Sequence, residues 1–355
     1  MAKAPWLQKN MNGDKFNETC AVRLCPIAVA HDHHPSLVSQ YQDGASASSA
    51  YKKMEQNMSV SFKGIVPALI TPMTPSEAVD EEGLRLLIDR LIEAGVHALF
   101  VLGTNGEFIA LSEAEKLRIA EIAVDQARSR VPVIAGTGAY ATRDVIALNH
   151  KMQERGVDAV SVITPYFNGA TQSELFAHYA AIATATPMPV MLYTIPAKAG
   201  VTLNIDTVRR LAEIPNIRGI KDSGGDFDRL VQLIGLRRDD FAVFTGTDSM
   251  ILWTLMAGGD GAVAATTNAV PNVVMSIWNS FQAGDIASAR LAQESLRALR
   301  DAFALGTMPV VLKTAAAMLG MPAGPARAPA QALDAKARER LSEALAIYRP
   351  YGSAN

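Results

Sequence analysis

The chain has 355 residues, 49% of them hydrophobic, and a formal net charge of only −2. A nearly neutral chain offers no broad basic surface, so we expect no nucleic-acid partner. The sequence contains no run of 18 or more apolar residues, and its first thirty residues lack the basic-then-apolar order of a secretory signal. We therefore expect a cytoplasmic protein without a membrane span.

Residues 1–60 differ in composition from the rest of the chain. They mix Asn, Gln, Ser, His and Lys without periodicity, and they contain both cysteines, Cys20 and Cys25. We predict an N-terminal extension that is either disordered or the product of a start assigned too early, with Met58 as the other candidate start. The remaining chain has no cysteine and only scattered histidines, so we expect neither a cysteine nucleophile nor a metal site in it.

Eight short apolar runs alternate with helical patterns from residue 64 onward. Their Val, Ile, Leu and Ala content is typical of parallel strands buried on both faces, and the alternation is typical of repeated βα units. The predicted strands span residues 65–70, 98–102, 131–135, 159–163, 190–193, 217–221, 242–245 and 261–264. We therefore predict an α/β fold in which residues 61–284 form a (β/α)8 TIM barrel.

Helix signals lie between and after these strands. Apolar residues recur at helical spacing over 84–92, and capping boxes open two later helices at Ser112/Glu115 and Thr171/Glu174. Residues 285–355 form a predicted C-terminal helical appendix. Its expected helices span residues 285–305, 308–319 and 334–347.

The residues that could take part in a reaction lie at the ends of the predicted strands. In such a barrel the chemistry lies at the carboxyl ends of the strands. Lys221 ends strand six just before a glycine-rich turn. A lysine there can attack a carbonyl to form an imine, provided that its surroundings favour the neutral amine. The alternative, a lysine that reaches from a strand end into water, stays open at this point.

Two other strand ends add hydrogen-bond donors. Strand two runs into a GTNGE turn, in which Gly103 lets backbone N–H groups turn inward beside Thr104 and Asn105, as suits a carboxylate. Tyr193 ends strand five, where its hydroxyl can shuttle protons. An ordinary turn and a tyrosine packed in the barrel are the alternatives.

Further residues are predicted to form the walls of the same mouth. Tyr166 and Phe167 follow strand four, Gly246 follows strand seven and Val263 lies on strand eight. We predict that Gly246 and Val263 contact substrate. Tyr166 and Phe167 are expected to be pocket walls or subunit contacts.

Four linked motifs resemble one known family. The segments GTNGE, TPYFN, Y-x-x-P-x-x-x-G and G-I-K-D-S, in this order, are similar to those of the pyruvate-dependent class I aldolases typified by dihydrodipicolinate synthase and N-acetylneuraminate lyase, over residues 62–347. The resemblance implies that Lys221 is the Schiff-base lysine, Tyr193 the proton-relaying acid/base, and Thr104 with Asn105 the binder of the oxo-acid carboxylate. It further implies a barrel with C-terminal helices, a homotetramer, and no metal or organic cofactor.

Three residues depart from the pattern of that family. Asn105 stands where a second Thr or Ser is usual, and its amide can still donate. Phe167 stands where dihydrodipicolinate synthases place a tyrosine that reaches into a neighbouring subunit's site, and Lys198, predicted to contact substrate, stands where they have an arginine. A phenyl ring passes no proton, and an ammonium does not reproduce a bidentate guanidinium.

These features predict a Schiff-base-forming lyase, an aldolase or a dehydratase, that acts on pyruvate and an aldehyde or on a 2-oxo-3-deoxy acid. One alternative within the class is 4-hydroxy-tetrahydrodipicolinate synthase itself. The alternative from another class is a non-catalytic sensor that binds 2-oxo acids. The aldehyde is not predicted, because substrate specificity depends on loops whose arrangement a single sequence does not give.

Overall fold

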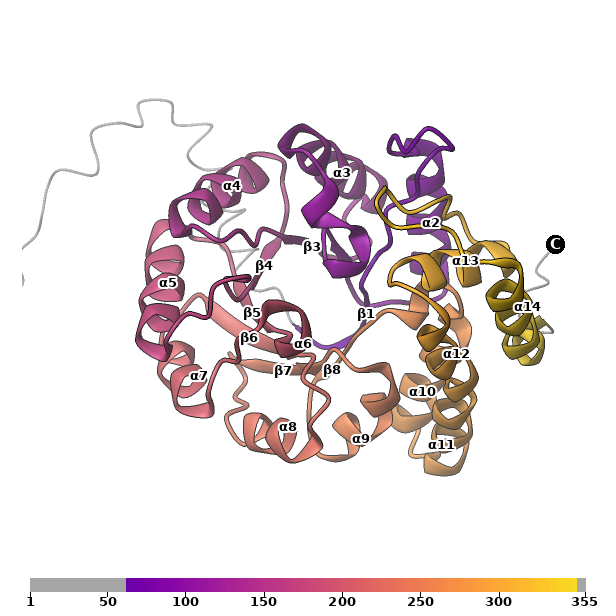
Figure 1. Ribbon diagram of the computed structural model, residues 1–355. Coiled ribbons are helices and arrows are strands. Elements are labelled where there is room, and N and C mark those ends of the chain that lie inside the picture. The colour runs from indigo at the N-terminus through magenta and orange to yellow at the C-terminus, as the bar shows by residue number, and fades with distance from the viewer. Residues whose placement is uncertain (1–61, 350–355) are drawn as a thin grey trace, which may run out of the picture. The chain divides into compact units, whose positions relative to one another are not determined.

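The computed structural model describes residues 62–349, which form a barrel of parallel strands surrounded by helices (Figure 1). The eight strands of its sheet follow the order β1-β8-β7-β6-β5-β4-β3-β2. They are β1 (Gly64–Pro67), β2 (Leu99–Val101), β3 (Val133–Gly136), β4 (Ala159–Ile163), β5 (Val190–Thr194), β6 (Ile217–Asp222), β7 (Ala242–Thr245) and β8 (Gly261–Ala264). The predicted barrel is confirmed.

The barrel closes between β1 and β2 just beyond the end of β1. Ala68 forms a parallel bridge with Phe100, and the Leu69 N–H donates to the Phe100 carbonyl at 2.9 Å. The sequence predicted β1 to continue to residue 70. It ends at Pro67, the Ala68 and Leu69 N–H groups still donate to the carbonyls of Ala264 and Phe100, and the Ile70 N–H donates to the side chain of Asn268, at 3.0 Å.

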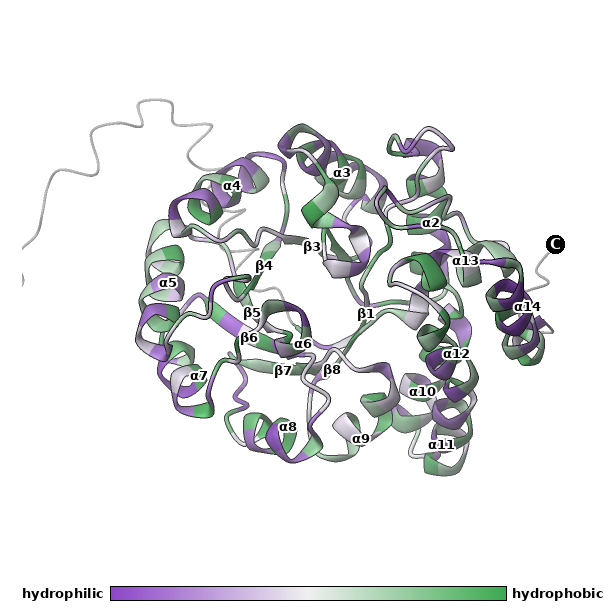
Figure 2. Ribbon diagram, in the orientation of Figure 1, coloured by the Kyte–Doolittle hydropathy of each residue, from purple (hydrophilic) through white to green (hydrophobic). Residues whose placement is uncertain are grey.

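The helices form an outer ring and a C-terminal group. Around the barrel lie α2 (Glu81–Glu93), α3 (Glu113–Ala127), α4 (Thr142–Glu154), α5 (Gln172–Ala185), α6 (Pro196–Ala199), α7 (Ile205–Ala212), α8 (Phe227–Ile234), α9 (Ile251–Met256) and α10 (Pro271–Gln282). The C-terminal group consists of α11 (Ile286–Ser295), α12 (Arg297–Ala302), α13 (Val310–Met318) and α14 (Ala335–Ala344). Green and purple residues alternate around the helices of the ring (Figure 2), as expected where one face packs on the barrel.

Local sequence explains several helix boundaries. Both predicted capping boxes are present, at Ser112 with Glu115 and at Thr171 with Glu174. The helix predicted over 285–305 is divided at Leu296 into α11 and α12. Figure 1 shows that α11 to α14 gather on one side of the barrel.

Alternate strand residues fill the inside of the barrel. A buried cluster contains one or two residues from seven strands, among them Phe100, Phe244 and Val263, and it is separate from the larger cluster between strands and helices. A closed barrel of eight strands is just wide enough for such a side-chain filling. Any opening for a ligand therefore lies above this filling, at the strand ends.

Some predictions concern residues outside the described part. The extension over residues 1–60, its two cysteines and its histidine-rich stretch lie outside residues 62–349. Within the described residues, the structure contains no helix long and apolar enough to cross a membrane. The cytoplasmic location and the division into three parts stay predictions.

Candidate active site

Lys221 and Tyr193 lie next to each other inside the barrel. They are paired in register between β5 and β6, which directs both side chains to the same face. The Lys221 Nζ lies 4.0 Å from the centroid of the Tyr193 ring and 4.9 Å from that of Phe100. Lys221 is only 4% exposed, and no hydrogen bond or ion pair of its Nζ occurs among the described residues. The amine therefore sits in a largely apolar, aromatic setting.

Thr104 joins this pair from the loop after β2. Its Oγ1 lies 3.1 Å from the Tyr193 hydroxyl, and either oxygen can donate. Thr104 begins the short 3-10 helix η1 (Thr104–Gly106), in which Asn105 is the next residue, half-buried like Thr104. The structure thus brings together the three residues that the sequence predicted as catalytic, from three different segments.

Two glycines allow the close approach of backbone to these side chains. A Cβ added at Gly246 would lie 1.9 Å from the Ser223 Oγ and 2.9 Å from the Lys221 Cε. A Cβ added at Gly103 would lie 2.9 Å from the Phe100 ring. A side chain at either position would force a neighbouring side chain or the loop to shift, and Gly246 lies directly against the lysine stem.

The remaining predicted residues occupy the filling and the rim. Val263 is buried in the interior cluster with Phe100. Tyr166 packs edge-on against Phe108, with ring centroids 6.0 Å apart, and burial raises the pKa of its phenol. Phe167 is 94% exposed, with a left-handed φ of 82° that is uncommon for a bulky residue.

Lys198 lies apart from the three central residues. It is exposed on the single-turn helix α6, and no contact between its side chain and Lys221, Tyr193 or Thr104 occurs among the described residues. Its ammonium is free to reach a ligand from the rim. The structure does not bring it into the central cluster.

Sequence reasoning missed two features of the site. Phe100 provides a second aromatic face for the Lys221 amine. Glu107, the last residue of the GTNGE turn, forms a buried ion pair with Lys313, whose Nζ lies 2.8 Å from its Oε1. Lys313 is the only charged residue in helix α13, which marks it as unusual but does not indicate its partner.

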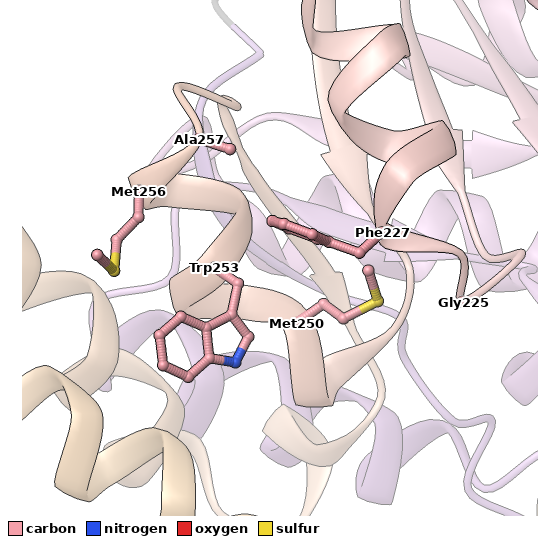
Figure 3. Close-up of a pocket in the computed structure, with 6 residues that line it drawn as sticks. All are labelled: Gly225, Phe227, Met250, Trp253, Met256 and Ala257. Carbon is pink, nitrogen blue, oxygen red and sulfur yellow. The ribbon is translucent and has the colours of Figure 1, made fainter. Parts of the chain in front are cut away.

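A separate apolar pocket lies on the outer surface, between α8 and α9. It has a volume of about 610 Å³ and is lined by Gly225, Phe227, Met250, Trp253, Met256 and Ala257. Figure 3 shows Phe227 and Met250 side by side, with Trp253 on the neighbouring turn. None of the predicted site residues lines this pocket, so it is not the site of the proposed chemistry.

Comparisons with known proteins agree with the geometry. Residues 61–348 match the model of the Dihydrodipicolinate synthetase family. The chain is 37% identical over 290 residues to a 4-hydroxy-tetrahydrodipicolinate synthase from Methanopyrus kandleri, a match that covers 81% of this chain and 95% of the relative.

Solved structures are similar over the same region. A dihydrodipicolinate synthase from Bacillus anthracis superposes with a TM-score of 0.78 at 36% identity, covering 81% of this chain and 98% of that one. A prophage protein of the dihydrodipicolinic acid synthase family from E. coli K12, in complex with pyruvate, gives a TM-score of 0.77 at 35% identity, covering 80% and 97%. The resemblance noted from the motifs is confirmed: the chain belongs to the dihydrodipicolinate synthetase family and is a lyase of the Schiff-base-forming, class I aldolase type.

Proposed function

We propose that Lys221 forms an imine with the keto carbon of pyruvate or of a 2-oxo-3-deoxy acid. The single observation that carries this proposal is the position of the Lys221 amine, buried between two aromatic rings and without an ion-pair partner among the described residues. In imine formation the nucleophile is the neutral amine. The amine attacks C2, the carbinolamine loses water, and a protonated imine results.

Tyr193 and Thr104 are proposed to move the protons of this reaction. Loss of water from the carbinolamine needs a proton on its departing oxygen, and a positioned hydroxyl can deliver it. The 3.1 Å contact between the Tyr193 hydroxyl and the Thr104 Oγ1 provides a path along which that proton can be replaced. The Asn105 amide and the N–H groups of the turn are proposed to hold the carboxylate of the oxo acid.

The protonated imine then acts as the electron sink for chemistry at C3. Loss of a C3 proton gives an enamine, whose C3 either adds to an aldehyde or, in a 2-oxo-3-deoxy acid, expels the hydroxyl on C4. Cleavage of the C3–C4 bond is the reverse of the addition. We propose that the substrate is a polar 2-oxo-3-deoxy acid, because the exposed Lys198 ammonium can meet its distal oxygens from the rim.

The second candidate is 4-hydroxy-tetrahydrodipicolinate synthase. The names of the curated relatives favour it. Phe167 and Lys198 argue against it, because the first lacks a hydroxyl and the second lacks the paired donors of a guanidinium. A non-catalytic sensor is disfavoured because a protein that only binds an oxo acid needs neither the amine of Lys221 nor the adjacent hydroxyl of Tyr193.

We also propose that the chain assembles as a homotetramer. In support, large apolar side chains remain exposed in two regions of the described surface. One is the rim, with Ile109, Tyr140 and Phe167, and the other comprises Phe227, Trp253 and Met256 beside the α8–α9 pocket. Light scattering coupled to size-exclusion chromatography measures the molar mass of the assembly directly.

Borohydride trapping tests the proposed chemistry. Reduction in the presence of pyruvate should add a pyruvate-derived mass to the peptide that carries Lys221, and the Lys221→Ala variant should show no adduct. Lys198→Ala is the matched control and should be trapped like the wild type. An unmodified Lys221 peptide in the wild type contradicts the proposal.

A further inference from the structure

The loop that carries Thr104 and Asn105 is tied to the C-terminal part of the chain through Glu107. Glu107 is 6% exposed and adopts a left-handed backbone conformation, with φ at 60°. One carboxylate oxygen, Oε1, accepts from the Lys313 Nζ at 2.8 Å, and the other, Oε2, accepts from the Arg327 backbone N–H at 2.8 Å. Both oxygens of this buried carboxylate are therefore held by residues more than 200 positions away.

Lys313 connects three segments at once. Its ammonium donates to the Glu107 carboxylate, to the Thr71 carbonyl at 2.8 Å and to the Pro325 carbonyl, which uses all three donors. Thr71 in turn donates from its hydroxyl to the Gly106 carbonyl at 2.8 Å. The chain just after β1, the loop after β2 and the segment after α13 are thus joined at one buried nitrogen.

Arg327 holds the other end of the same loop. Its guanidinium donates to the Ala110 carbonyl at 2.8 Å and to both oxygens of Glu115 at 2.7 and 3.0 Å. Its hydrogen bond lowers the pKa of Glu115 to about 2. The loop from Thr104 to Ala110 is therefore fixed at its middle through Glu107 and at its end through Arg327.

A buried ion pair is a poor source of stability, because desolvation of two charges offsets most of their attraction. Burial also acts against the Lys313 charge and lowers the pKa of its ammonium, while Glu107 acts in the opposite direction. What the pair does provide is fixed geometry, since Lys313 and Glu107 each bond to groups from more than one segment of the chain. That geometry lies directly beside the turn proposed to bind the carboxylate of the substrate.

We propose that Lys313 is a positioning residue, which holds Glu107 and thereby sets the backbone of Thr104 and Asn105 in the shape that binds the carboxylate of a 2-oxo acid. This inference rests on the proposed function, because it assigns a purpose to the loop only if that loop binds the oxo acid. Lys313 itself touches no reacting atom. The C-terminal helices would then be part of the substrate-binding apparatus, although they lie outside the barrel.

The experiment separates positioning from stability. The double variant Glu107→Gln/Lys313→Met removes both charges and leaves no unpaired buried ion. The Thr71 and Pro325 carbonyls lose their donor, so we expect a modest fall in melting temperature, no larger than that of the control variant below. We expect the pyruvate concentration for half-maximal borohydride trapping on Lys221 to rise at least about tenfold, which corresponds to about 1.4 kcal/mol of binding. The maximal trapped fraction should stay near the wild-type value, because the amine and Tyr193 are untouched.

Two further variants complete the design. Thr71→Val removes only the hydrogen bond to Gly106 and should raise the half-maximal concentration by a smaller factor, so the test still works if the double variant folds poorly. Arg237→Met is the matched control, because it breaks the 2.8 Å pair with the buried Asp260 at the opposite end of the barrel. It should lower the melting temperature without changing the half-maximal concentration.

The outcomes are distinguishable. If the wild type is trapped and neither the double variant nor Thr71→Val needs more pyruvate, Lys313 is merely structural and the inference is wrong. If Arg237→Met raises the half-maximal concentration as much as the double variant does, the effect is one of general stability, and the inference is again wrong. If the wild type itself is not trapped, the proposed function and this inference both fail.

Discussion

Tyr193 and Lys221 are direct partners in the parallel pairing of β5 and β6, with the lysine Nζ 4.0 Å from the centroid of the tyrosine ring. Residues paired in register point to the same side of a sheet, so the pairing alone places a phenol beside an amine inside the barrel. The ring contacts the amine while the hydroxyl reaches the Thr104 Oγ1. One tyrosine thus serves two purposes, which substitution can separate.

The Tyr193→Phe variant should keep the fold and still bind 2-oxo acid, because the ring and its contact with the amine remain. It loses the hydroxyl, so we expect turnover to fall about 10² to 10⁴-fold, the usual effect of removing a positioned acid/base. Steady-state kinetics and pyruvate binding measured on the same preparation give both values. Tyr348→Phe is the matched control: that buried hydroxyl donates to the Ser295 carbonyl, among the C-terminal helices. Near-normal turnover in Tyr193→Phe would mean that another group carries the proton.

The Gly246→Ala variant tests how closely the loop after β7 approaches the lysine. The new methyl group would lie 1.9 Å from the Ser223 Oγ and 2.9 Å from the Lys221 Cε, so the lysine stem or the loop must shift. A displacement on the order of 1 Å can cost about 10²-fold in rate, and we expect a loss of that size in turnover. Gly169→Ala, which adds a methyl group with no atom within 4 Å, should be active. Equal activity of the two variants contradicts the placement of Gly246.

Much of the fold could be predicted from local patterns. Each strand is a short apolar run, and the capping boxes of α3 and α5 depend on residues only three positions apart. The proximity of Lys221 and Tyr193 followed from the rule that parallel strands end at the same face of a barrel. These features depend on short-range sequence or on one general rule of the architecture.

The ion pair between Glu107 and Lys313 could not be predicted in this way. Its partners are 206 residues apart, and neither the GTNGE turn nor helix α13 indicates the other. The end of β1 is similar, because the Ile70 N–H bonds to Asn268, 198 residues further along the chain. Such contacts depend on how the barrel closes and how it packs against its C-terminal helices, so periodicity does not show them.

His178 should make the protein less stable as the pH falls. Its side chain is buried, its Nδ1 lies 2.9 Å from the Thr142 Oγ1, and burial lowers the pKa of its imidazole to about 4. The unfolded chain, with a histidine pKa near 6.5, then binds more protons than the folded one between pH 6.5 and 4. Stability is therefore lost on acidification through that range, by about 2 kcal/mol at pH 5.

Urea unfolding at pH 7.5 and pH 5 measures this loss. In the His178→Phe variant the free energy of unfolding should change less between the two pH values, because the titrating group is absent. If the wild type and the variant lose equal stability, the imidazole of His178 does not control this part of the acid response.

The departures at Phe167 and Lys198 predict which reaction is preferred. Phe167 offers a 94% exposed phenyl ring without a hydroxyl, and Lys198 offers one exposed ammonium at the rim. Without a hydroxyl to complete a relay, condensation of pyruvate with aspartate semialdehyde should be at least about a hundredfold slower than the best reaction of this enzyme, because loss of a proton relay costs on that order. A polyhydroxylated 2-oxo-3-deoxy acid should be the better substrate.

The preferred reaction is found by measuring kcat/KM for both substrate types in the wild type, in Phe167→Tyr and in Lys198→Met. Phe167→Tyr should raise kcat/KM for aspartate semialdehyde and leave that for the sugar acid nearly unchanged. Lys198→Met should lower kcat/KM for the sugar acid alone, because an uncharged side chain of similar length no longer meets its distal oxygens. If wild type prefers aspartate semialdehyde, Phe167 does not block the relay, and the protein is a 4-hydroxy-tetrahydrodipicolinate synthase like its curated relatives.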